Sequence, residues 1–465
     1  MQEIIQSFFK ERSLVNHQLA SYDDCIPAGD NNLSRMEKII RNIRVGTDEE
    51  INDDDGGFIK LDVVDQDITI RLKNIQLGEP TIREANGAEH PSTPMECRLR
   101  KLTYMSPVTI DFQIFRNGIR SPKEEAVQVG SMPIMVRSKR CNLHAGHIAG
   151  DRQLYPTTST EDSALWDDLL RKKGEDPLDP GGYFIINGTE RVLISMEDLA
   201  PNRVTVEINK RYAKRTEVAK IFSQKDGMRK PLNVEKRRDG MLMVKISTAG
   251  TTAIPVVLLM RALGIENDQE VFQTVAGPTE TFKYIVANLN EVNDNEEYAV
   301  QSRDEAHEWL QKKFAAGQQR EYREQRVNQL LDRELLPHLG DQPTARKKKA
   351  IFLGRIVRQV LEMALTNREP NDKDHYANKR VRLAGDLVED LFRVSSGQLA
   401  RDLKYQLERH HNRKRELKIT SCLRPDVLTS KICLLYTSPR PTRRYAISYA
   451  VFCLKKKRGG GGGGG

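Results

Sequence analysis

The residues best suited to chemistry lie close together between Asp372 and Arg382. Asp372 and Asp374 precede His375. Four cations are interspersed with them: Lys373, Lys379, Arg380 and Arg382. These residue types could bind a divalent metal, transfer a proton, or grip a polyanion without performing a reaction. Which of these applies decides whether the chain is itself a catalyst.

A metal site is the weaker interpretation of this stretch. Asp372, Asp374 and His375 would supply three ligands within four residues, which seldom face one ion, and no second histidine follows one helical turn away. Because Pro370 ends the preceding helix, we expect Asp372 or Asp374 to accept backbone N–H bonds at a turn. His375 would pack against the following helix. We therefore predict structural support from Asp374 and His375, and no metal ion.

Length and composition indicate a soluble protein of several domains. The chain is 38% hydrophobic and 30% charged, which is typical of a globular protein. Its 465 residues are too many for a single compact core. No apolar run approaches the ~18–20 residues that cross a bilayer. The first residues carry charges where a signal peptide is apolar. We expect a cytoplasmic protein without membrane contact.

The net charge of +9 suggests a polyanionic partner, but much of it lies in the tail. Residues 433–465 contain seven lysines and arginines, no acidic residue, no helical period and seven terminal glycines. The tail is either a disordered basic arm or, as we favour, non-native sequence. In the remainder, residues 371–432 hold 14 basic and nine acidic side chains, so positive charge concentrates there.

Signatures of catalysis are missing elsewhere in the sequence. The six cysteines include no C-x-x-C pair, which leaves reduced thiols as the plain interpretation. Three consecutive aspartates at 53–55 predict a solvated turn rather than a magnesium site. There is no P-loop and no G-x-S-x-G elbow.

Changes of pattern divide the chain into segments. After a helical start to about residue 43, strands alternate, with a turn expected at Ser106-Pro107. The clearest hairpin is "GYFIINGTERVLI", where Asn187-Gly188 suits a turn with positive φ. Residues 202–341 change to strands followed by charged helices, which predicts a separate α+β domain inserted into the first.

A helix is expected after Arg382. Its apolar stripe would consist of Leu387, Leu391, Val394, Leu399, Leu403 and Leu407. At its end, "RHHNRKREL" (409–417) is the densest basic run in the chain outside the tail. That run is either a solvated helix end or a nucleic-acid contact.

Four stretches together carry a family resemblance. They are "RLRKLTYMSPVTIDF" (98–112), "GSMPIMVRSKRCNL" (130–143), "GGYFIINGTERVLISMEDLAPNRV" (181–204) and "DKDHYANKRVRLAGDLVEDLF" (372–392). In this order and spacing they resemble the amino-terminal half of the second-largest subunit of multisubunit DNA-directed RNA polymerases. The similarity is greatest to the archaeal form in which that subunit is split and its amino-terminal half is called B double-prime.

The resemblance implies a mixed α+β, multidomain fold. Residues 1–201 and 342–370 would form a discontinuous protrusion domain, with the lobe domain inserted as residues 202–341. Residues 371–432 would be a fork region. The fork would be incomplete, because the family continues where residues 433–465 depart from its pattern.

The resemblance also implies a role in transcription. The chain would belong to a nucleotidyltransferase and form one wall of its nucleic-acid cleft, with no catalytic residue of its own. Magnesium and zinc would be held by partner subunits, so no cofactor is expected here. The expected partners are the complementary half of the split subunit, the largest subunit, the assembly subunits, template DNA and the RNA–DNA hybrid.

The family assigns the basic residues to nucleic-acid phosphate. The residues implied are Lys373, Lys379, Arg380 and Arg382. From the charge of the basic run at 409–417 we add Arg409 and Arg413 as expected nucleic-acid contacts. Asp374 would orient neighbouring arginines, and Asn187 and Gly188 would support the hairpin. A stand-alone basic nucleic-acid-binding regulator is the alternative, and a metal-dependent nuclease would require Asp372, Asp374 and His375 to converge with other acids.

Overall fold

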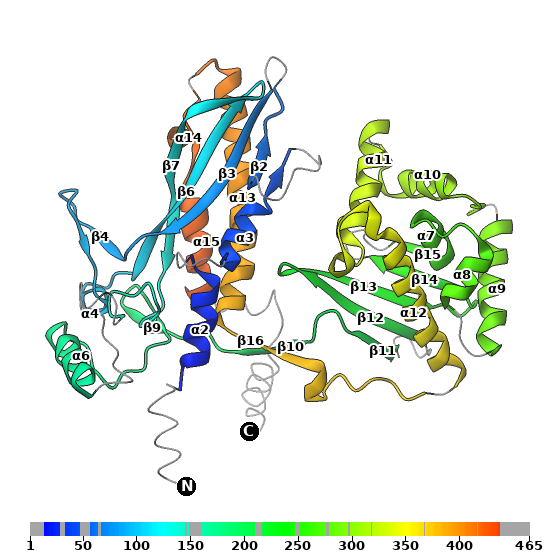
Figure 1. The fold of residues 1–465 in the computed structure, drawn as a ribbon, viewed down its shortest axis with the longest axis horizontal. Helices are drawn as coiled ribbons and strands as arrows, with labels where there is room; N and C mark the ends of the chain where they lie inside the picture. Colours follow the sequence, from blue (N-terminus) through cyan, green and yellow to red (C-terminus); the bar gives the residue numbers. More distant parts are fainter. Residues whose placement is uncertain are drawn as a thin grey trace, which may run out of the picture. The chain divides into compact units, whose positions relative to one another are not determined.

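The chain forms two compact units in the computed structural model (Figure 1). Unit 1 comprises Met1–Glu197 and Val381–Gly465, and unit 2 comprises Asp198–Arg380. The described residues are 14–27, 33–46, 56–63, 67–144, 147, 160–209, 216–246, 252–275, 279–295, 298–317, 319–366, 368–415 and 417–437. The two connections between the units are strands β10 (Met196–Leu199) and β16 (Lys379–Arg382), which pair as a two-stranded sheet.

Unit 1 is built on a five-stranded sheet in the order β1-β2-β3-β6-β7. Its strands are β1 (Arg44–Val45), β2 (Gly57–Lys60), β3 (Ile68–Leu77), β6 (Met105–Arg116) and β7 (Ile119–Pro133). Only β1 and β2 pair in parallel. Burial alternates along β3 and β6, so one face of the sheet supplies apolar side chains to the core.

Short hairpins and helices complete unit 1. The hairpins are β4 (Thr81–Arg83) with β5 (Glu89–Pro91), and β8 (Phe184–Ile186) with β9 (Thr189–Arg191). The helices are α2 (Asn16–Cys25), α3 (Arg35–Arg41), α4 (Pro94–Leu99), α6 (Thr160–Lys172), α13 (Ala384–Asn412), α14 (Ile419–Cys422) and α15 (Asp426–Thr437). Helix α15 includes the first residues of the expected non-native tail, and residues 438–465 lie outside the described part.

The hairpin expected at Asn187-Gly188 is present. Both residues have positive φ, 52° and 75°, and Ile186 pairs with Thr189 across the turn. A Cβ on Gly188 would lie 2.7 Å from the Cα of Lys101, so no other residue fits without movement. The turn expected at Ser106-Pro107 is wrong, because β6 runs through both residues. A register shift between Val108 and Thr109 lies next to the proline, which has no N–H to give to the ladder.

Helix α13 is the long helix of unit 1, and other elements of the unit pack against it. Leu399 and Leu403 face Leu72 of β3 and Phe112 of β6 across a small gap. Leu399, Leu403 and Leu407 are buried as predicted, but the first half of the predicted stripe is wrong. The buried positions there are Val388, Phe392 and Ser395, whereas Leu387 and Leu391 are half-buried and Val394 is 47% exposed.

The rotation of α13 is set where the helix begins. The Oε1 of Gln18 accepts from the N–H of Ala384 (2.9 Å), and the Oγ of Ser21 accepts from the N–H of Gly385 (3.2 Å). Helix α2 therefore satisfies two of the free N–H groups at this helix start. A Cβ on Gly385 would lie 1.9 Å from the carbonyl oxygen of Ser21, so only glycine permits this approach.

Unit 2 is a second α+β structure with its own core. Its sheet is antiparallel, in the order β11-β12-β13-β14-β15. The strands are β11 (Val204–Asn209), β12 (Thr216–Lys225), β13 (Met228–Lys236), β14 (Leu242–Ile246) and β15 (Ala253–Pro255). The helices are α7 (Val256–Ala262), α8 (Asp268–Val275), α9 (Thr279–Asp294), α10 (Arg303–Phe314), α11 (Arg320–Gln329) and α12 (Arg346–Leu365).

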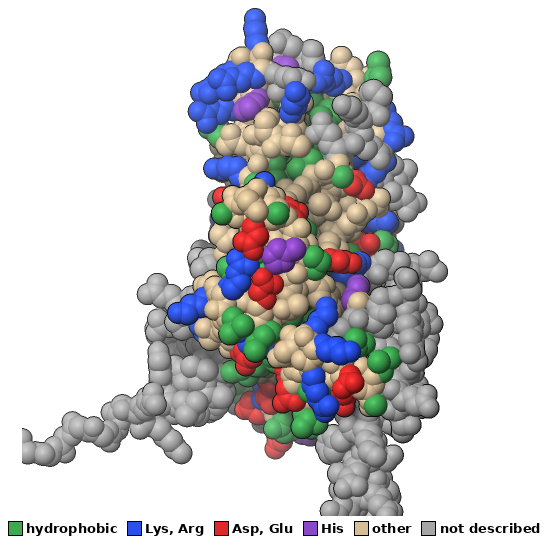
Figure 2. Space-filling model, turned by 90° about the vertical axis from the view of Figure 1, so that its left-hand side faces the viewer, with side chains coloured by type: hydrophobic (Ala, Val, Ile, Leu, Met, Phe, Trp, Pro, Cys, Tyr) green, Lys and Arg blue, Asp and Glu red, His purple; other side chains and the backbone are tan. Residues whose placement is uncertain are grey.

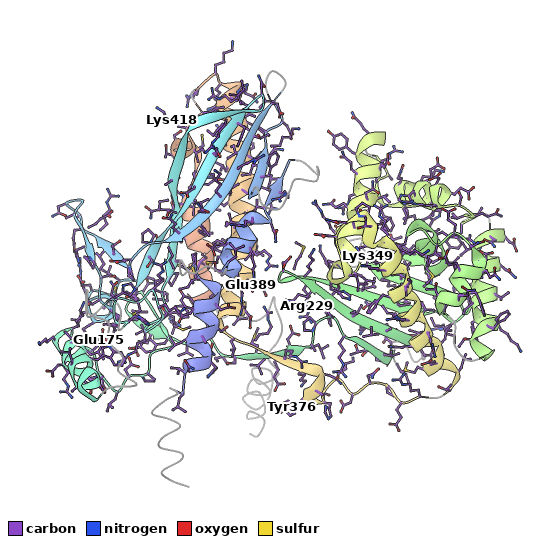
Figure 3. All side chains as sticks on the ribbon, in the orientation of Figure 1. Glu175, Arg229, Lys349, Tyr376, Glu389 and Lys418 are labelled. Carbon is purple, nitrogen blue, oxygen red and sulfur yellow. The ribbon has the colours of Figure 1, made fainter. Side chains whose placement is uncertain are left out.

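Helix α12 corrects the predicted domain boundary at residue 341. It buries Leu353, Ile356, Val357 and Val360 in the same core as β12 and β13, so residues 342–370 do not return to the first domain. Lys349, labelled in Figure 3, donates from Nζ to two backbone carbonyls of a preceding π-helical turn (Leu330–Glu334). Burial lowers the pKa of Lys349 to about 8. Among the described helices of both units, none combines the length and apolar composition needed to cross a membrane.

The buried face of α13 is open to a direct stability test. Phe392→Ala removes a fully buried ring and should lower the free energy of unfolding by about 3–5 kcal/mol. Val394→Ala, two positions away on the exposed side, should change it by less than ~0.5 kcal/mol. Guanidinium unfolding followed by circular dichroism measures both. Equal costs for the two variants would contradict the orientation of the helix.

Candidate nucleic-acid interface

The predicted basic stretch is a turn fastened to unit 2. The N–H of Asn371 donates to the carbonyl of Val206 in β11, and the Asn371 side chain accepts from the N–H of Val206, both at 2.9 Å. At the other end of the turn, the carbonyl of Asn378 accepts from the N–H of Ala200 (2.8 Å). Residues 371–380 therefore belong to unit 2, while the expected fork continues at residue 381 in unit 1.

Within this turn, Asp372 and His375 bond to the backbone. Asp372 Oδ1 accepts from the N–H of Asp374 (2.8 Å), and His375 Nδ1 accepts from the N–H of Ala377 (3.1 Å). His375 is exposed, which corrects the expectation that it packs against a helix, because only a three-residue 3₁₀ turn (Tyr376–Asn378) follows it. The Asp374 side chain is 95% exposed.

Two of the predicted cations already lie beside carboxylates of unit 2. Lys373 forms an ion pair with Glu207 of β11. Lys379 Nζ lies 3.7 Å from Asp374 Oδ1, so Asp374 neighbours a lysine rather than an arginine. Each pairing offsets local positive charge, and exposed pairs of this kind contribute little stability, about 0–1 kcal/mol.

Two arginines instead converge on one backbone oxygen. Arg380 Nη1 lies 3.4 Å, and Arg203 Nη1 3.0 Å, from the carbonyl oxygen of Ala377. Both side chains are exposed. Arg203 is not predicted from the sequence, because it stands outside the basic stretch by more than 160 residues and no local pattern marks it.

Arg382 is held at the start of α13 in unit 1. Its Nη2 donates to Asp390 Oδ2 (2.5 Å) and to the carbonyl of Asp386 (3.3 Å), and the residue is half-buried. A guanidinium engaged in this way positions the helix start and has less to offer an external phosphate. Of the four cations of the predicted stretch, Arg380 is thus the one bonded only to backbone carbonyls in the described part of the chain.

Arg409 and Arg413 lie at the opposite end of α13. At 1.5 Å per residue they are about 40 Å from Arg382, so the six predicted cations do not form one patch. Both are exposed, as are Lys414 and Arg415. Across the described residues, none of these four pairs with a carboxylate. Figure 2 shows basic side chains gathered at the end of unit 1 where Figure 3 labels Lys418.

The arrangement also bears on the metal hypothesis. Among the described residues, the one group of potential metal ligands that gathers closely is Glu84, His90 and Glu96, not Asp372, Asp374 and His375. The aspartates at 53–55 lie outside the described residues.

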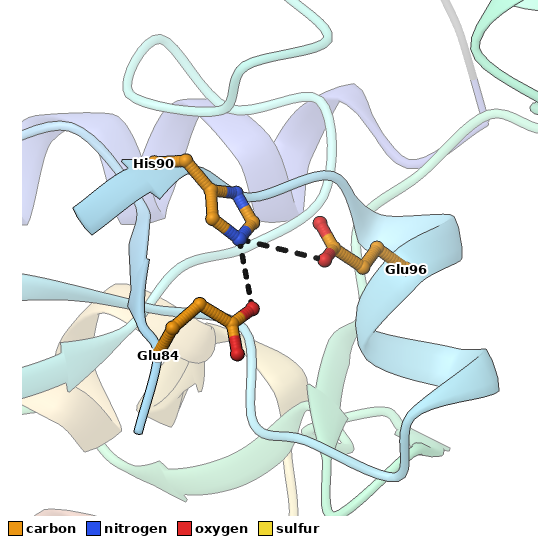
Figure 4. A group of neighbouring side chains, drawn as sticks. All are labelled: Glu84, His90 and Glu96. Atoms are coloured by element: carbon orange, nitrogen blue, oxygen red, sulfur yellow. Dashed lines mark hydrogen bonds and ion pairs between the residues drawn. The ribbon is translucent and has the colours of Figure 1, made fainter. Parts of the chain in front are cut away.

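The Glu84 group is an ion-pair cluster between the β4–β5 hairpin and α4 (Figure 4). His90 Nε2 lies 3.1 Å from Glu84 Oε1 and 3.8 Å from Glu96 Oε1. Arg100 Nη1 contacts the same two oxygens at 2.6 and 2.9 Å, so both carboxylates are already paired with a guanidinium. The hydrogen bond from Arg100 lowers the pKa of Glu84 to about 2, and the bond to Glu84 raises the pKa of His90.

Comparison with known proteins identifies the family. Residues 200–382 match the model for RNA polymerase Rpb2, domain 2, and residues 13–154 match that for RNA polymerase beta subunit. The chain is 38% identical over 440 residues to the DNA-directed RNA polymerase subunit Rpo2N of Halobacterium salinarum, covering 92% of this chain and 76% of the relative. The chain belongs to the Rpo2N family. The Rpo2N subunit of Methanocaldococcus jannaschii is 39% identical over 435 residues, covering 93% and 79%.

Membership of the Rpo2N family confirms the predicted resemblance. The chain corresponds to the amino-terminal half of a split second-largest subunit. It is also 37% identical over 429 residues to the Rpo2 subunit of Saccharolobus solfataricus, covering 92% of this chain but 34% of that relative. Both ends of the domain 2 match lie within two residues of the ends of unit 2. The match also includes α12, in agreement with the corrected boundary.

The Glu84 cluster predicts a shifted histidine titration. In Glu84→Gln the amide still accepts a hydrogen bond but carries no charge, so the pKa of His90 should fall back toward its ordinary ~6.5. Because the pKa of His90 is raised in the folded chain, its contribution to holding the hairpin is present at low pH and is lost as pH rises through that pKa. NMR of the His90 ring against pH measures the shift.

A matched control is available on the same hairpin. Glu89→Gln removes an exposed carboxylate that is not bonded to His90, and it should leave the titration in place. An unchanged His90 titration in Glu84→Gln would contradict the assignment of the shift to Glu84.

Proposed function

We propose that this chain forms one wall of the nucleic-acid cleft in a DNA-directed RNA polymerase and is not catalytic alone. The observation that carries the proposal is the agreement between the inserted unit and the domain 2 match, together with relatives at 36–39% identity over 92–93% of the chain. Each of these relatives is named as a DNA-directed RNA polymerase subunit. Their names support a role in an assembly that acts as a nucleotidyltransferase.

The units take domain roles within this proposal. Unit 1 is assigned to the protrusion and unit 2, including α12, to the lobe. The fork region begins in the turn after residue 370 and continues through β16 into α13. Within this fork region, the turn is hydrogen-bonded to residues of unit 2, and α13 packs in the core of unit 1.

Ion pairs within the chain decide which of the predicted cations we assign to nucleic-acid phosphate first. Arg380, Arg409 and Arg413 are exposed and have no carboxylate partner among the described residues, so we assign phosphate contact to them first. Lys373, Lys379 and Arg382 are paired inside the chain and would act mainly as supports. Phosphate contacts carry no sequence information, which suits a polymerase that must transcribe any template.

Catalytic chemistry is assigned to partner subunits. Nucleotide addition uses two magnesium ions held by clustered carboxylates. Within the described residues, the closest such cluster is Glu84, His90 and Glu96, and both of its carboxylates are paired with Arg100. We therefore place magnesium and zinc on the partners, which would be the complementary half, the largest subunit and the assembly subunits. We also propose that the chain acts in the cytoplasm, where an archaeal polymerase would meet its DNA template.

Assembly is the first test of this proposal. Co-expression with the other polymerase subunits, followed by purification through a tag on one of those subunits, should recover this chain in the complex. DNA-directed RNA synthesis should require that complex, and the isolated chain should synthesise nothing. If the chain stays out of the complex yet binds DNA tightly in a salt-sensitive way, the stand-alone regulator replaces this proposal.

The basic end of α13 gives a second test, made in the assembled complex. Arg409→Ala with Arg413→Ala should weaken DNA binding for all sequences and reduce the slope of log K against log salt by about one for each phosphate that is no longer neutralised. Arg424→Ala is the matched control, because Arg424 is already paired with Asp402. Fluorescence anisotropy of labelled DNA at several salt concentrations measures the slopes. Equal slopes for the double variant and the control would rule these arginines out as phosphate contacts.

A further inference from the structure

Lys349 is a fully buried lysine on α12 of unit 2, where Figure 3 labels it. Its Nζ donates to the backbone carbonyls of Leu331 (2.9 Å) and Asp332 (2.5 Å) in the π-helical turn Leu330–Glu334. Carbonyls near the end of a helical segment lack a partner within the helix, and the lysine supplies the missing donors. Lys349 therefore ties the segment that follows α11 to α12.

The hydrogen-bonding partners of Lys349 suit a neutral amine better than an ammonium. Both carboxylate oxygens of Asp332 are taken by Arg346, whose Nε and Nη2 lie 2.7 and 2.6 Å from them. In the part of the chain that the structure describes, Lys349 has no carboxylate within ion-pair distance and bonds to carbonyls alone. A neutral amine has two N–H groups for these two carbonyls, whereas a buried cation without a counter-ion is costly.

The surroundings of Lys349 do not compensate for a buried charge. The charged and titratable groups that face it are Asp332 on the π-helical turn, Arg346 on α12, Lys225 on β12, His338 in a 3₁₀ turn (Pro337–Leu339), and Asp341 after that turn. The two aspartates favour the ammonium, and the arginine and the other lysine oppose it. Burial is the largest effect, and it lowers the pKa of Lys349 from its ordinary 10.5 to about 8.

The same segment has two further sources of strain when it is closed. Leu336 has a φ of 44°, which is unfavourable for a bulky residue. Glu334 is buried, and its Oε2 has no hydrogen-bond partner among the described residues, although its Oε1 lies 3.4 Å from Arg326. Opposing these costs, Leu335 and Leu336 are buried in the core that includes α12. Opening would expose both leucines and let water reach Lys349.

We propose that residues 330–345 form a proton-linked latch of unit 2. With Lys349 neutral, the segment is closed against α12. When Nζ takes a proton from water or a buffer acid, the ammonium requires solvation, and the segment opens. Only an N–H bond forms in this step, and the acid that gives the proton becomes its conjugate base. The latch lies within one unit and does not depend on the proposed function.

Proton linkage fixes the direction of the pH effect. The pKa of Lys349 is lowered in the closed segment, and it returns toward its ordinary 10.5 when the segment opens. Between about pH 8 and 10.5 the open form therefore holds a proton that the closed form has released, so closing becomes more favourable as pH rises. With these values, opening should be about tenfold less frequent at pH 9 than at pH 7, and nearly unchanged between pH 6 and pH 7.

Hydrogen exchange of the full chain, followed by mass spectrometry, measures the opening. In peptides covering residues 330–345, the exchange rate divided by the intrinsic rate at each pH should fall about tenfold from pH 7 to pH 9. In Lys349→Met this pH dependence should disappear, because no group at that position titrates. Lys349→Arg stays charged at both pH values and should exchange quickly at both. Lys348→Met is the matched control, since Lys348 is exposed on the same helix, and it should behave as the wild-type chain does.

The wild-type chain alone can contradict the latch, even if a variant does not fold. Equal protection of residues 330–345 at pH 7 and pH 9 would overturn the inference. So would a loss of protection at pH 7 that spreads evenly over the peptides of unit 2, because that pattern indicates global unfolding rather than opening of one segment. A folded Lys349→Met chain that keeps the wild-type pH dependence would assign the effect to another group and overturn it as well.

Discussion

The junction between α2 and α13 is the constraint on which unit 1 depends. Residues more than 360 positions apart meet there, because the side-chain oxygens of Gln18 and Ser21 accept hydrogen bonds from the first N–H groups of α13. Arg35 of α3 adds ion pairs to Asp386 (2.5 Å) and Glu389 (3.3 Å) of the same helix. This junction joins the two chain segments of unit 1 that unit 2 separates in the sequence. It also fixes which side of a long helix faces the sheet.

Charge in this chain is organised by pairing rather than by simple accumulation. Lys373, Arg382 and Arg100 all stand in basic or mixed clusters of the sequence, but each has a carboxylate within ion-pair distance. Such residues set the geometry of turns and helix starts. The exposed arginines at the end of α13 and at the carbonyl of Ala377 have no carboxylate partner among the described residues, and it is to them that we assign an external anion. The net charge of the sequence alone does not separate these two groups.

Local signals in the sequence were sufficient for some features and not for others. Asn187-Gly188 specified its hairpin because positive φ at both positions is a local requirement. The sequence indicates where the inserted domain starts but not where it ends. The apolar face of α12 shows that this helix is buried, but it does not show in which of the two cores. The stripe of α13 was shifted by one residue in its first half, since a contact with α2 sets the rotation. For the candidate site, the basic turn was found, whereas its pairing with Glu207 and the approach of Arg203 arise only in the folded chain.

The pairing of β10 with β16 has a consequence for the order of folding. Unit 2 enters and leaves through neighbouring strands, so its two ends lie side by side once it has folded. An unfolded insert of this length would impose a large closure entropy on the meeting of α2 with α13. Once unit 2 has folded, the two ends of unit 1 that flank it are separated only by the distance between two paired strands. During synthesis, therefore, unit 2 can fold before unit 1 is complete. Once folded, it holds the amino-terminal and carboxy-terminal segments of unit 1 close together in the chain.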